Sequence, residues 1–126
     1  METCRKKILV VEDDSLFLWS LESFLNREGY EVSPVQSGES ALDIARSQSF
    51  DLIISDFQLP GLNGRELIRK IKSLQPATKA ILISAHQLDE VETEKDSLLN
   101  AYLNKPIELG ILKKLVDDLT HSLMGC

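Results

Sequence analysis

The sequence predicts a single α/β domain with a doubly wound parallel sheet. Three apolar runs are continuous rather than alternating, which is typical of strands covered on both faces: residues 7–11, 51–55 and 80–84. Helix-like stretches separate these runs, and strict alternation of strand and helix predicts helices on the faces of a parallel sheet. The chain has 126 residues, the size of one domain. We therefore expect residues 1–126 to form one domain, with a core over about residues 6–122.

Two weaker strands complete the predicted sheet of five. The first covers residues 30–33 and is expected to end at Pro34, because proline donates no backbone hydrogen bond and suits a sheet edge. The second covers residues 101–104, directly before Lys105 and Pro106.

Five helices are expected to flank this sheet. Phe17, Leu21, Phe24 and Leu25 recur at helical spacing, and Gly29 is well placed to end that helix. Apolar spacing marks the other helices at residues 41–45, 67–74 and 112–123, and more weakly at residues 88–100.

Composition and charge exclude several classes of function. Fourteen basic and twenty acidic residues give a net charge of −6, which argues against a nucleic-acid surface. No apolar stretch is long enough to cross a bilayer, and the N-terminus does not resemble a signal peptide. The two cysteines, Cys4 and Cys126, are too few for a disulfide framework. We expect a cytoplasmic protein that binds neither nucleic acid nor membrane.

Polar side chains stand where the predicted strands end. Glu12 and Asp13 follow the first strand, Asp56 follows the third, Ser84 closes the fourth and Lys105 follows the fifth. Ligands bind beyond the carboxyl ends of the strands in such a sheet, so these side chains should gather at one edge. Asp14, the next acid, is expected to cap the first helix or to lie on the surface.

The charges at this edge indicate a divalent cation. Two carboxylates about 4 Å apart repel by roughly 4 kcal/mol at an effective dielectric constant near 20. Oxygen ligands without histidine or cysteine favour Mg²⁺ over Zn²⁺. A carboxylate beside a divalent ion and a lysine can act as a nucleophile toward phosphorus.

Four segments closely resemble the receiver domain of bacterial two-component response regulators. They are Ile8–Asp13 (I-L-V-V-E-D), Asp56–Gly64 (D-F-Q-L-P-G-L-N-G), Ser84-Ala85 and Lys105-Pro106. The resemblance covers essentially the whole chain. It implies a flavodoxin-like fold with strand order 2-1-3-4-5, Mg²⁺ as cofactor, and an aspartate that accepts a phosphoryl group from a histidine kinase or a phosphotransfer protein.

Site roles carry over from the family residue by residue. Asp56 would be the phosphoacceptor and a metal ligand, and Asp13 would be a second direct ligand. Glu12 would act mostly through a metal-bound water, and Gln58 would offer its backbone carbonyl to the metal. Lys105 would bind a phosphoryl oxygen, and the resemblance also implies a cis peptide bond between Lys105 and Pro106.

The resemblance implies a switch as well. Ser84 would move its hydroxyl onto the phosphoryl group, and Tyr102 would follow it inward. These movements would remodel the face built from the fourth helix, the fifth strand and the fifth helix. The partner at that face would be a downstream protein, a fused effector domain or a second copy of the chain after phosphorylation.

Two other classes of function remain as alternatives. A haloacid-dehalogenase-like phosphatase also uses a nucleophilic aspartate and Mg²⁺, but it needs a general acid two residues later, where this chain has Gln58. A receiver that serves only as an interaction module is the other alternative, and the intact Asp13, Asp56, Ser84 and Lys105 argue against it. We expect a signalling domain that catalyses its own phosphorylation and dephosphorylation rather than an enzyme acting on a pool of substrate.

Two features of the chain depart from the expected pattern. The Gly-Ala pair usual before the tyrosine is missing, and the segment from Ser84 to Lys105 is one residue shorter than is typical, so the fourth helix is expected to be shortened or remodelled. Leu16, Leu18 and Trp19 are predicted to lie off the apolar stripe, with Trp19 about 160° from Leu21. In receivers the kinase docks against the first helix, which suggests a docking role for Trp19.

Overall fold

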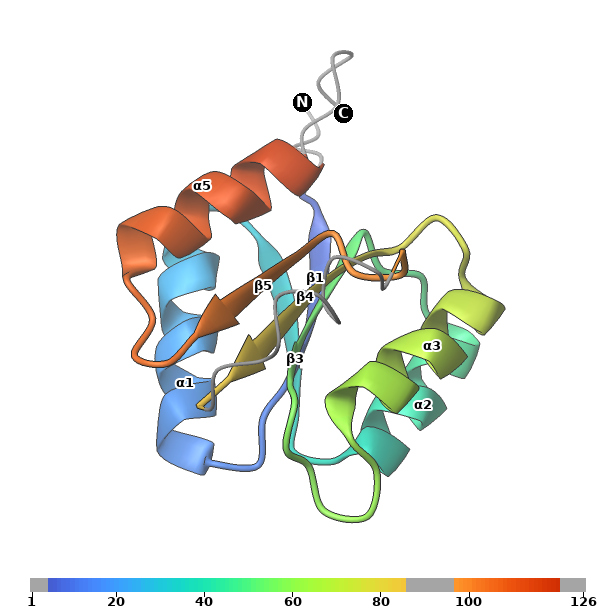
Figure 1. The fold of residues 1–126 in the computed structure, drawn as a ribbon. Helices are drawn as coiled ribbons and strands as arrows, with labels where there is room; N and C mark the ends of the chain where they lie inside the picture. Colours follow the sequence, from blue (N-terminus) through green and yellow to red (C-terminus); the bar gives the residue numbers. More distant parts are fainter. Residues whose placement is uncertain (1–4, 86–96, 121–126) are drawn as a thin grey trace.

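The computed structural model describes residues 5–85 and 97–120 as three layers, with a central sheet between two layers of helices (Figure 1). Five parallel strands lie in the order β2-β1-β3-β4-β5. The strands are β1 (Lys7–Val11), β2 (Glu31–Val35), β3 (Leu52–Asp56), β4 (Lys79–Ser84) and β5 (Ala101–Asn104). The predicted fold class and strand order are confirmed.

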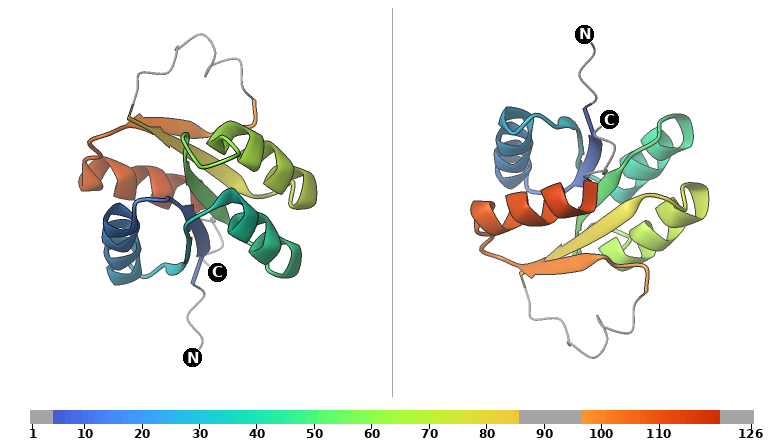
Figure 2. Two further views of the ribbon diagram at one scale, coloured as in Figure 1. Left: turned by 90° about the horizontal axis from the view of Figure 1, so that it is seen from below. Right: turned by 90° about the horizontal axis from the view of Figure 1, so that it is seen from above.

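Among the described residues, four helices flank the sheet: α1 (Ser15–Arg27), α2 (Gly38–Ser47), α3 (Gly64–Leu74) and α5 (Leu109–Thr120). Helices α1 and α5 cover one face, and α2 and α3 cover the other (Figure 2). Residues 88–96 of the remaining predicted helix lie outside the described part of the chain, and residues 97–100 form a turn instead of a helix end. None of the helices described is long and apolar enough to cross a membrane.

Local sequence signals set the helix ends. The Asp14 carboxylate caps α1 and accepts two backbone N–H groups of its first turn at 3.0 and 3.3 Å. The side chains of Ser37 and Asn63 cap α2 and α3 in the same way. Gly29 follows α1 with φ at 96°, a left-handed conformation that glycine adopts without strain. The predicted cap and the predicted helix stop are both confirmed.

The buried stripe of α1 differs from the expected one at a single residue. Leu18 is 7% exposed and packs in the core with Leu21 and Leu25, although it was predicted to lie off the stripe. It precedes Leu21 by three residues, so the two side chains are only about 60° apart around the helix. Leu16 and Trp19 lie off the stripe as predicted, with 72% and 62% of their surface exposed.

Strand β2 forms one edge of the sheet and includes Pro34, where it was expected to stop. The backbone N–H of Glu31 donates to the carbonyl of Lys6, just before β1, and the carbonyl of Val35 accepts the N–H of Glu12, just after β1. Residues of a strand alternate in the side to which their N–H and carbonyl groups point. Pro34 therefore has its nitrogen on the outer side, where the missing donor breaks no bond of this sheet.

The side chain of Gln75 connects three segments at the amino edge of the sheet. Its amide nitrogen donates to the carbonyls of Ala45 and Gln48 at 2.7 and 2.6 Å, at the end of α2. Its amide oxygen accepts the backbone N–H of Phe50 at 2.9 Å and the hydroxyl of Thr78 at 3.1 Å. The amide therefore joins the ends of α2 and α3 to the segments that lead into β3 and β4.

A polar contact connects α5 to the start of β2. Tyr30 is buried, and its hydroxyl donates to the carboxylate of Asp117. The hydroxyl of Thr120 lies 3.3 Å from the hydroxyl oxygen of Tyr30. Burial, together with the hydrogen bond to Asp117, raises the pKa of Tyr30 to about 12.

Candidate functional site

Three carboxylates meet at the carboxyl edge of the sheet. Glu12 and Asp13 follow β1, and Asp56 is the last residue of β3, the neighbouring strand. One oxygen atom from each side chain lies within 4.8 Å of the other two. Glu12 and Asp56 are only 2% and 6% exposed, whereas Asp13 is exposed. The three acids therefore form one cluster that is open to solvent on the side of Asp13.

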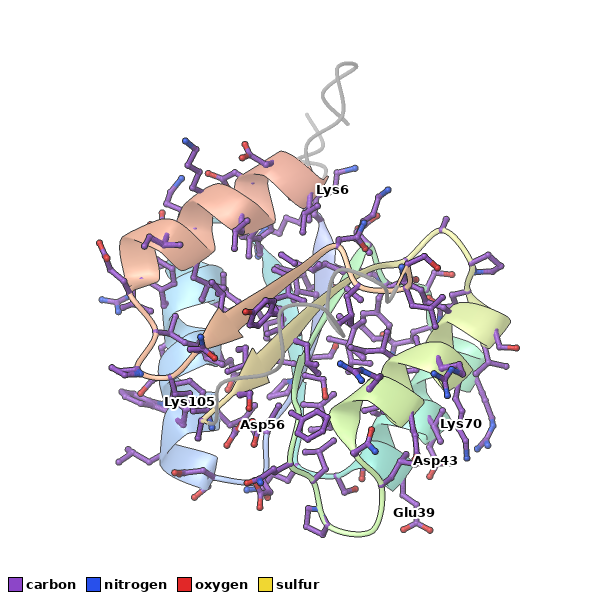
Figure 3. The ribbon with its side chains drawn as sticks, viewed as in Figure 1. Lys6, Glu39, Asp43, Asp56, Lys70 and Lys105 are labelled. Atoms are coloured by element: carbon purple, nitrogen blue, oxygen red, sulfur yellow. The ribbon has the colours of Figure 1, made fainter. Side chains whose placement is uncertain are left out.

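The ammonium group of Lys105 lies against this cluster. Its Nζ atom is 3.4 Å from Glu12 Oε1 and 3.6 Å from Asp56 Oδ1. Figure 3 shows Lys105 and Asp56 near each other. The backbone N–H of Lys105 donates to the carbonyl of Ser84 at 2.8 Å, which connects this residue to β4. The Lys105–Pro106 peptide bond is cis, as the resemblance implied.

Burial makes ionisation of the two inner carboxylates unfavourable. Desolvation and the nearby Asp56 together raise the pKa of Glu12 to about 7, although Lys105 and the backbone N–H of Asp14 lower it in part. Desolvation also raises the pKa of Asp56, and Lys105 partly offsets this effect. With all groups ionised, three carboxylates and one ammonium give a formal charge of −2 at this site. The single positive charge of Lys105 therefore does not balance the three negative charges of the cluster.

The donor set fits a divalent metal ion. The cluster offers only carboxylate oxygens, the ligands that Mg²⁺ prefers, and it has one exposed side from which a hydrated ion could enter. A divalent ion would also balance the formal charge of the cluster. Glu12, Asp13 and Asp56 are thus the residues that could hold Mg²⁺ in this chain.

The other predicted site residues lie on the neighbouring strands and loop. Ser84 ends β4 and is fully buried, and Tyr102 on β5 is partly buried against the core on the side of α2 and α3. Leu82 pairs in register with Tyr102, and Ser84 follows two residues later, so Ser84 and Tyr102 belong to the same face of the sheet. Gln58 lies two residues after Asp56 and has an exposed side chain, and the role of its backbone carbonyl stays a prediction.

Gly64 allows the start of α3 to pack closely against the end of β3. A β-carbon at this position would lie 2.2 Å from the carbonyl oxygen of Asp56. The backbone N–H of Gly64 also donates to the carbonyl of Phe57 at 2.7 Å. The first turn of α3 can approach the end of β3 this closely only because residue 64 has no side chain.

Sequence reasoning missed one neighbour of the charged cluster. The ring centroid of Phe17 lies 4.6 Å from Lys105 Nζ, within the usual range of a cation–π interaction. The apolar spacing of α1 indicated Phe17 only as a core residue. Its position one turn after Asp13 was the signal that could have placed it beside the site.

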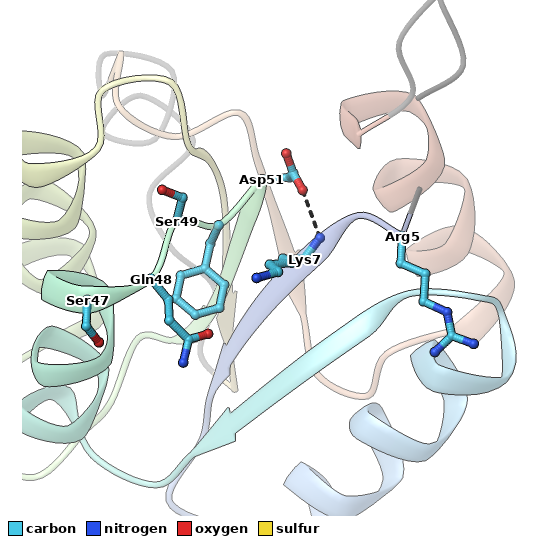
Figure 4. Close-up of a pocket in the computed structure, with 7 residues that line it drawn as sticks. Arg5, Lys7, Ser47, Gln48, Ser49 and Asp51 are labelled. Atoms are coloured by element: carbon cyan, nitrogen blue, oxygen red, sulfur yellow. Dashed lines mark hydrogen bonds between the residues drawn. The ribbon is translucent and has the colours of Figure 1, made fainter. Parts of the chain in front are cut away.

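A hollow lies at the edge of the sheet opposite to the acidic cluster (Figure 4). It surrounds the start of β3, where the backbone N–H of Lys7 donates to Asp51 Oδ2 at 2.8 Å. Its lining residues are Arg5, Lys7, Ser47, Gln48, Ser49, Phe50 and Asp51. None of them belongs to the acidic cluster, which lies at the other end of β1 and β3.

Comparison with known proteins shows the family. Residues 8–117 match the response regulator receiver domain, and the chain belongs to this family. Receiver domains of two-component response regulators accept phosphoryl groups on an aspartate and bind Mg²⁺ at an acidic pocket. The resemblance read from the sequence is therefore confirmed.

Solved structures support the same assignment. The chain is similar to a CheY-like receiver domain protein from Methanospirillum hungatei JF-1, with 30% identity, a TM-score of 0.83, and coverage of 92% of this chain and 94% of that one. It is also similar to response regulator protein TrrA from Thermotoga maritima, solved in complex with Mg(2+)-BeF, with 32% identity, a TM-score of 0.79, and coverage of 90% and 98%.

Several curated relatives are much longer proteins. A response regulator receiver protein of Anaeromyxobacter sp. is 32% identical over 81% of this chain, which spans 43% of that protein. The chain spans only 23% of the DNA-binding transcriptional regulator NtrC of Klebsiella pneumoniae, with 32% identity over 86% of the chain. By contrast, it spans 90% of sporulation initiation phosphotransferase F of Bacillus subtilis, with 28% identity over 88% of the chain.

Proposed function

We propose that this chain is a single cytoplasmic receiver domain that accepts a phosphoryl group on Asp56 from the phosphohistidine of a sensor kinase or a phosphotransfer protein. The observation that carries this proposal is the placement of the Lys105 ammonium beside Asp56, within a cluster of three acids. An Asp56 oxygen attacks phosphorus, an O–P bond forms, and the N–P bond breaks with its electron pair returning to the imidazole. The other ring nitrogen of the donor carries a proton, so the histidine leaves as a neutral imidazole.

The residues around Asp56 divide this work. Asp13 and Asp56 would hold Mg²⁺ directly, Glu12 would hold it through a water molecule, and Gln58 would contribute its backbone carbonyl. The bound ion supplies positive charge that offsets the negative charge on the phosphoryl oxygens. Lys105 supplies a second positive charge, as a point charge on a side chain long enough to move from the carboxylates to a phosphoryl oxygen.

The phosphorylated site changes the face formed by β5, α5 and the segment before β5. In this proposal Ser84 donates its hydroxyl to the phosphoryl group, and Tyr102 moves inward on the same face of the sheet. Leu109 and Ile111, which are 43% and 51% exposed at the start of α5, supply apolar surface on this face. The face then regulates a downstream protein, an effector domain of the same protein, or a second copy of the chain.

The phosphoryl donor docks on α1 in this proposal. Leu16 and Trp19 expose large apolar side chains in the first two turns of this helix, which begins beside the acidic cluster. A Trp19→Ala variant should be phosphorylated more slowly by the cognate kinase and at the native rate by a small acyl phosphate. An unchanged rate from the kinase would contradict a docking role for Trp19.

The first test of the proposal is intact mass after incubation with Mg²⁺ and a small acyl phosphate, followed by a cold quench. The native chain should gain one phosphoryl group, and this gain should be lost in Asp56→Asn and without Mg²⁺. Asp43→Asn is the matched control, since Asp43 is an exposed aspartate on α2 (Figure 3) that should not affect labelling.

Each alternative function predicts a different result. A native chain that gains no mass under any condition would favour a receiver used only as an interaction module. Catalytic release of phosphate from simple phosphate esters would favour a phosphatase. Mass gain that persists in Asp56→Asn would place the acceptor at another residue.

A further inference from the structure

The backbone of Lys105 is fixed, but its side chain is long and needs support. Its N–H is bonded to β4, whereas four rotatable bonds separate the backbone from the ammonium group. Holding such a side chain in one conformation costs as much as about 2 kcal/mol of rotamer entropy. The site must therefore supply contacts that keep the ammonium beside Asp56.

The carboxylates restrain Lys105 only loosely. Both Glu12 oxygens lie 3.4 Å from Nζ, and Asp56 Oδ1 lies at 3.6 Å. Short charge-assisted hydrogen bonds are about 2.7–2.9 Å long. The ammonium therefore lies between the acids without a short bond to either of them.

Phe17 supplies a third contact from a different element. Its ring centroid is 4.6 Å from Nζ, and the ring packs against the core formed under α1. The backbone N–H of Phe17 donates to the Asp14 cap at 3.3 Å, while the N–H of Asp14 donates to Glu12 at 3.3 Å. One turn of backbone thus orients both the ring and the Glu12 carboxylate around Lys105.

The ring attracts the ammonium in a way that suits a group that must move. A cation–π interaction acts on the whole charge and uses no particular N–H bond. The three N–H donors of the lysine therefore stay available for carboxylate and phosphoryl oxygens. The attraction also persists when a phosphoryl oxygen replaces a carboxylate oxygen beside the ammonium group.

We infer that Phe17 is a positioning residue, which holds the Lys105 ammonium at the phosphorylation site through the face of its ring. This inference rests on the proposed function of Asp56 and Lys105 in phosphoryl transfer. It assigns to α1 a part in the chemistry as well as in the core.

The test compares Phe17→Leu with Phe17→Tyr in phosphorylation by a small acyl phosphate. Leucine keeps an apolar side chain but removes the ring face, so the rate should fall about three- to tenfold, and tyrosine should restore it. Phe24→Leu is the matched control, because Phe24 packs on the same core two turns further along α1. Its rate should match that of the native chain.

A double-mutant cycle separates positioning from general damage to the fold. If Phe17 acts through Lys105, Phe17→Leu should have no further effect on the residual rate of Lys105→Met. An equal loss in both backgrounds, or no loss in the native background, would overturn the inference.

A second measurement does not depend on phosphorylation or on Mg²⁺. Protons held over an aromatic ring resonate upfield, so the ε-methylene signal of Lys105 should be upfield in the native chain and in Phe17→Tyr, but not in Phe17→Leu. The same shift in Phe17→Leu would overturn the inference. If the native chain takes no phosphoryl group, the proposed function fails, and an upfield shift then shows only that the contact exists.

Discussion

Gly64 lies so close to Asp56 that a β-carbon at residue 64 would be 2.2 Å from the Asp56 carbonyl oxygen and 3.0 Å from its carbonyl carbon. Both atoms belong to the backbone, so no side-chain rotation can relieve the contact. The packing of α3 against the end of β3 therefore requires that residue 64 has no side chain. The position of the Asp56 carboxylate depends on it in turn.

Gly64→Ala is expected to destabilise the fold by about 1–3 kcal/mol and to slow the phosphorylation of Asp56, because β3 and α3 must separate. Gly110→Ala is the control, since its β-carbon would meet nothing closer than the Glu108 side chain at 3.8 Å. That control should be neutral or slightly stabilising, because alanine favours a helix over glycine. Urea unfolding and intact mass measure the two effects. Equal stability of the two variants would show that α3 adjusts freely.

Glu12→Gln is expected to stabilise the Mg²⁺-free protein at pH 8. The folded state raises the pKa of Glu12 to about 7, so it retains a proton that the unfolded chain releases near pH 4.5. Native stability without Mg²⁺ should therefore fall as the pH rises from about 4.5 to 7, and Asp56, whose pKa is also raised, should add to this fall. Glutamine removes the contribution of residue 12, worth on the order of 1 kcal/mol.

Urea unfolding with and without Mg²⁺ measures this prediction. Added Mg²⁺ should stabilise the native chain more than Glu12→Gln at pH 8, because only the native chain keeps the carboxylate at residue 12. Glu39→Gln, on the exposed first turn of α2, is the control and should keep the native pH profile. A native profile that is flat between pH 4.5 and 7 would contradict the raised pKa.

Gln75→Ala is expected to destabilise the fold by about 2–3 kcal/mol, because it leaves two backbone carbonyls and the N–H of Phe50 without the partner they have in the native chain. Gln36→Ala, an exposed glutamine in the loop after β2, should cost little. Urea unfolding compares the two. Because Gln75 lies at the opposite edge from Asp56, the phosphorylation rate at a temperature where both variants are folded should be native. A large loss of rate would show that the two edges of the sheet are coupled.

Tyr30→Phe is expected to destabilise the fold by about 1 kcal/mol and to increase hydrogen exchange in α5, because Asp117 and Thr120 lose the hydroxyl between them. Phosphorylation of Asp56 should be unaffected, since Tyr30 directly precedes β2, at the edge of the sheet opposite to the one where Asp56 ends β3. A double-mutant cycle with Asp117→Asn measures the pairwise contribution. A coupling energy near zero would show that the contact does not hold α5.

The sheet and the acidic cluster could be predicted because they depend on local patterns. Continuous apolar runs define β1, β3 and β4, and the polar residues that end these runs must meet wherever parallel strands end together. Leu18 was misassigned although helical spacing alone placed it within about 60° of Leu21. The spacing of apolar residues was therefore sufficient to place Leu18 in the core. The error lay in choosing which residues form the buried stripe.

Other contacts depend on tertiary packing that no local pattern reveals. The ring of Phe17 reaches Lys105 only because α1 packs beside the loop after β5, 88 residues further along the chain. The amide of Gln75 meets Ala45 and Gln48 because α2 and α3 end side by side, and an isolated glutamine after a helix carries no sign of this. Gly64 was part of the quoted motif, but only the folded backbone shows why it must be glycine.

Pro34 limits the ways in which copies of this protein can aggregate. Among residues 31–35 of β2, the backbone groups of residues 32 and 34 point away from β1. Proline at position 34 has no N–H to donate there. An incoming strand would find one N–H group, at Val32, where an ordinary edge strand offers two. The exposed Glu31 adds a charge to the same edge. Growth of the sheet from one molecule into the next is disfavoured at β2, so a chain stored at high concentration is protected there against amyloid-like polymerisation.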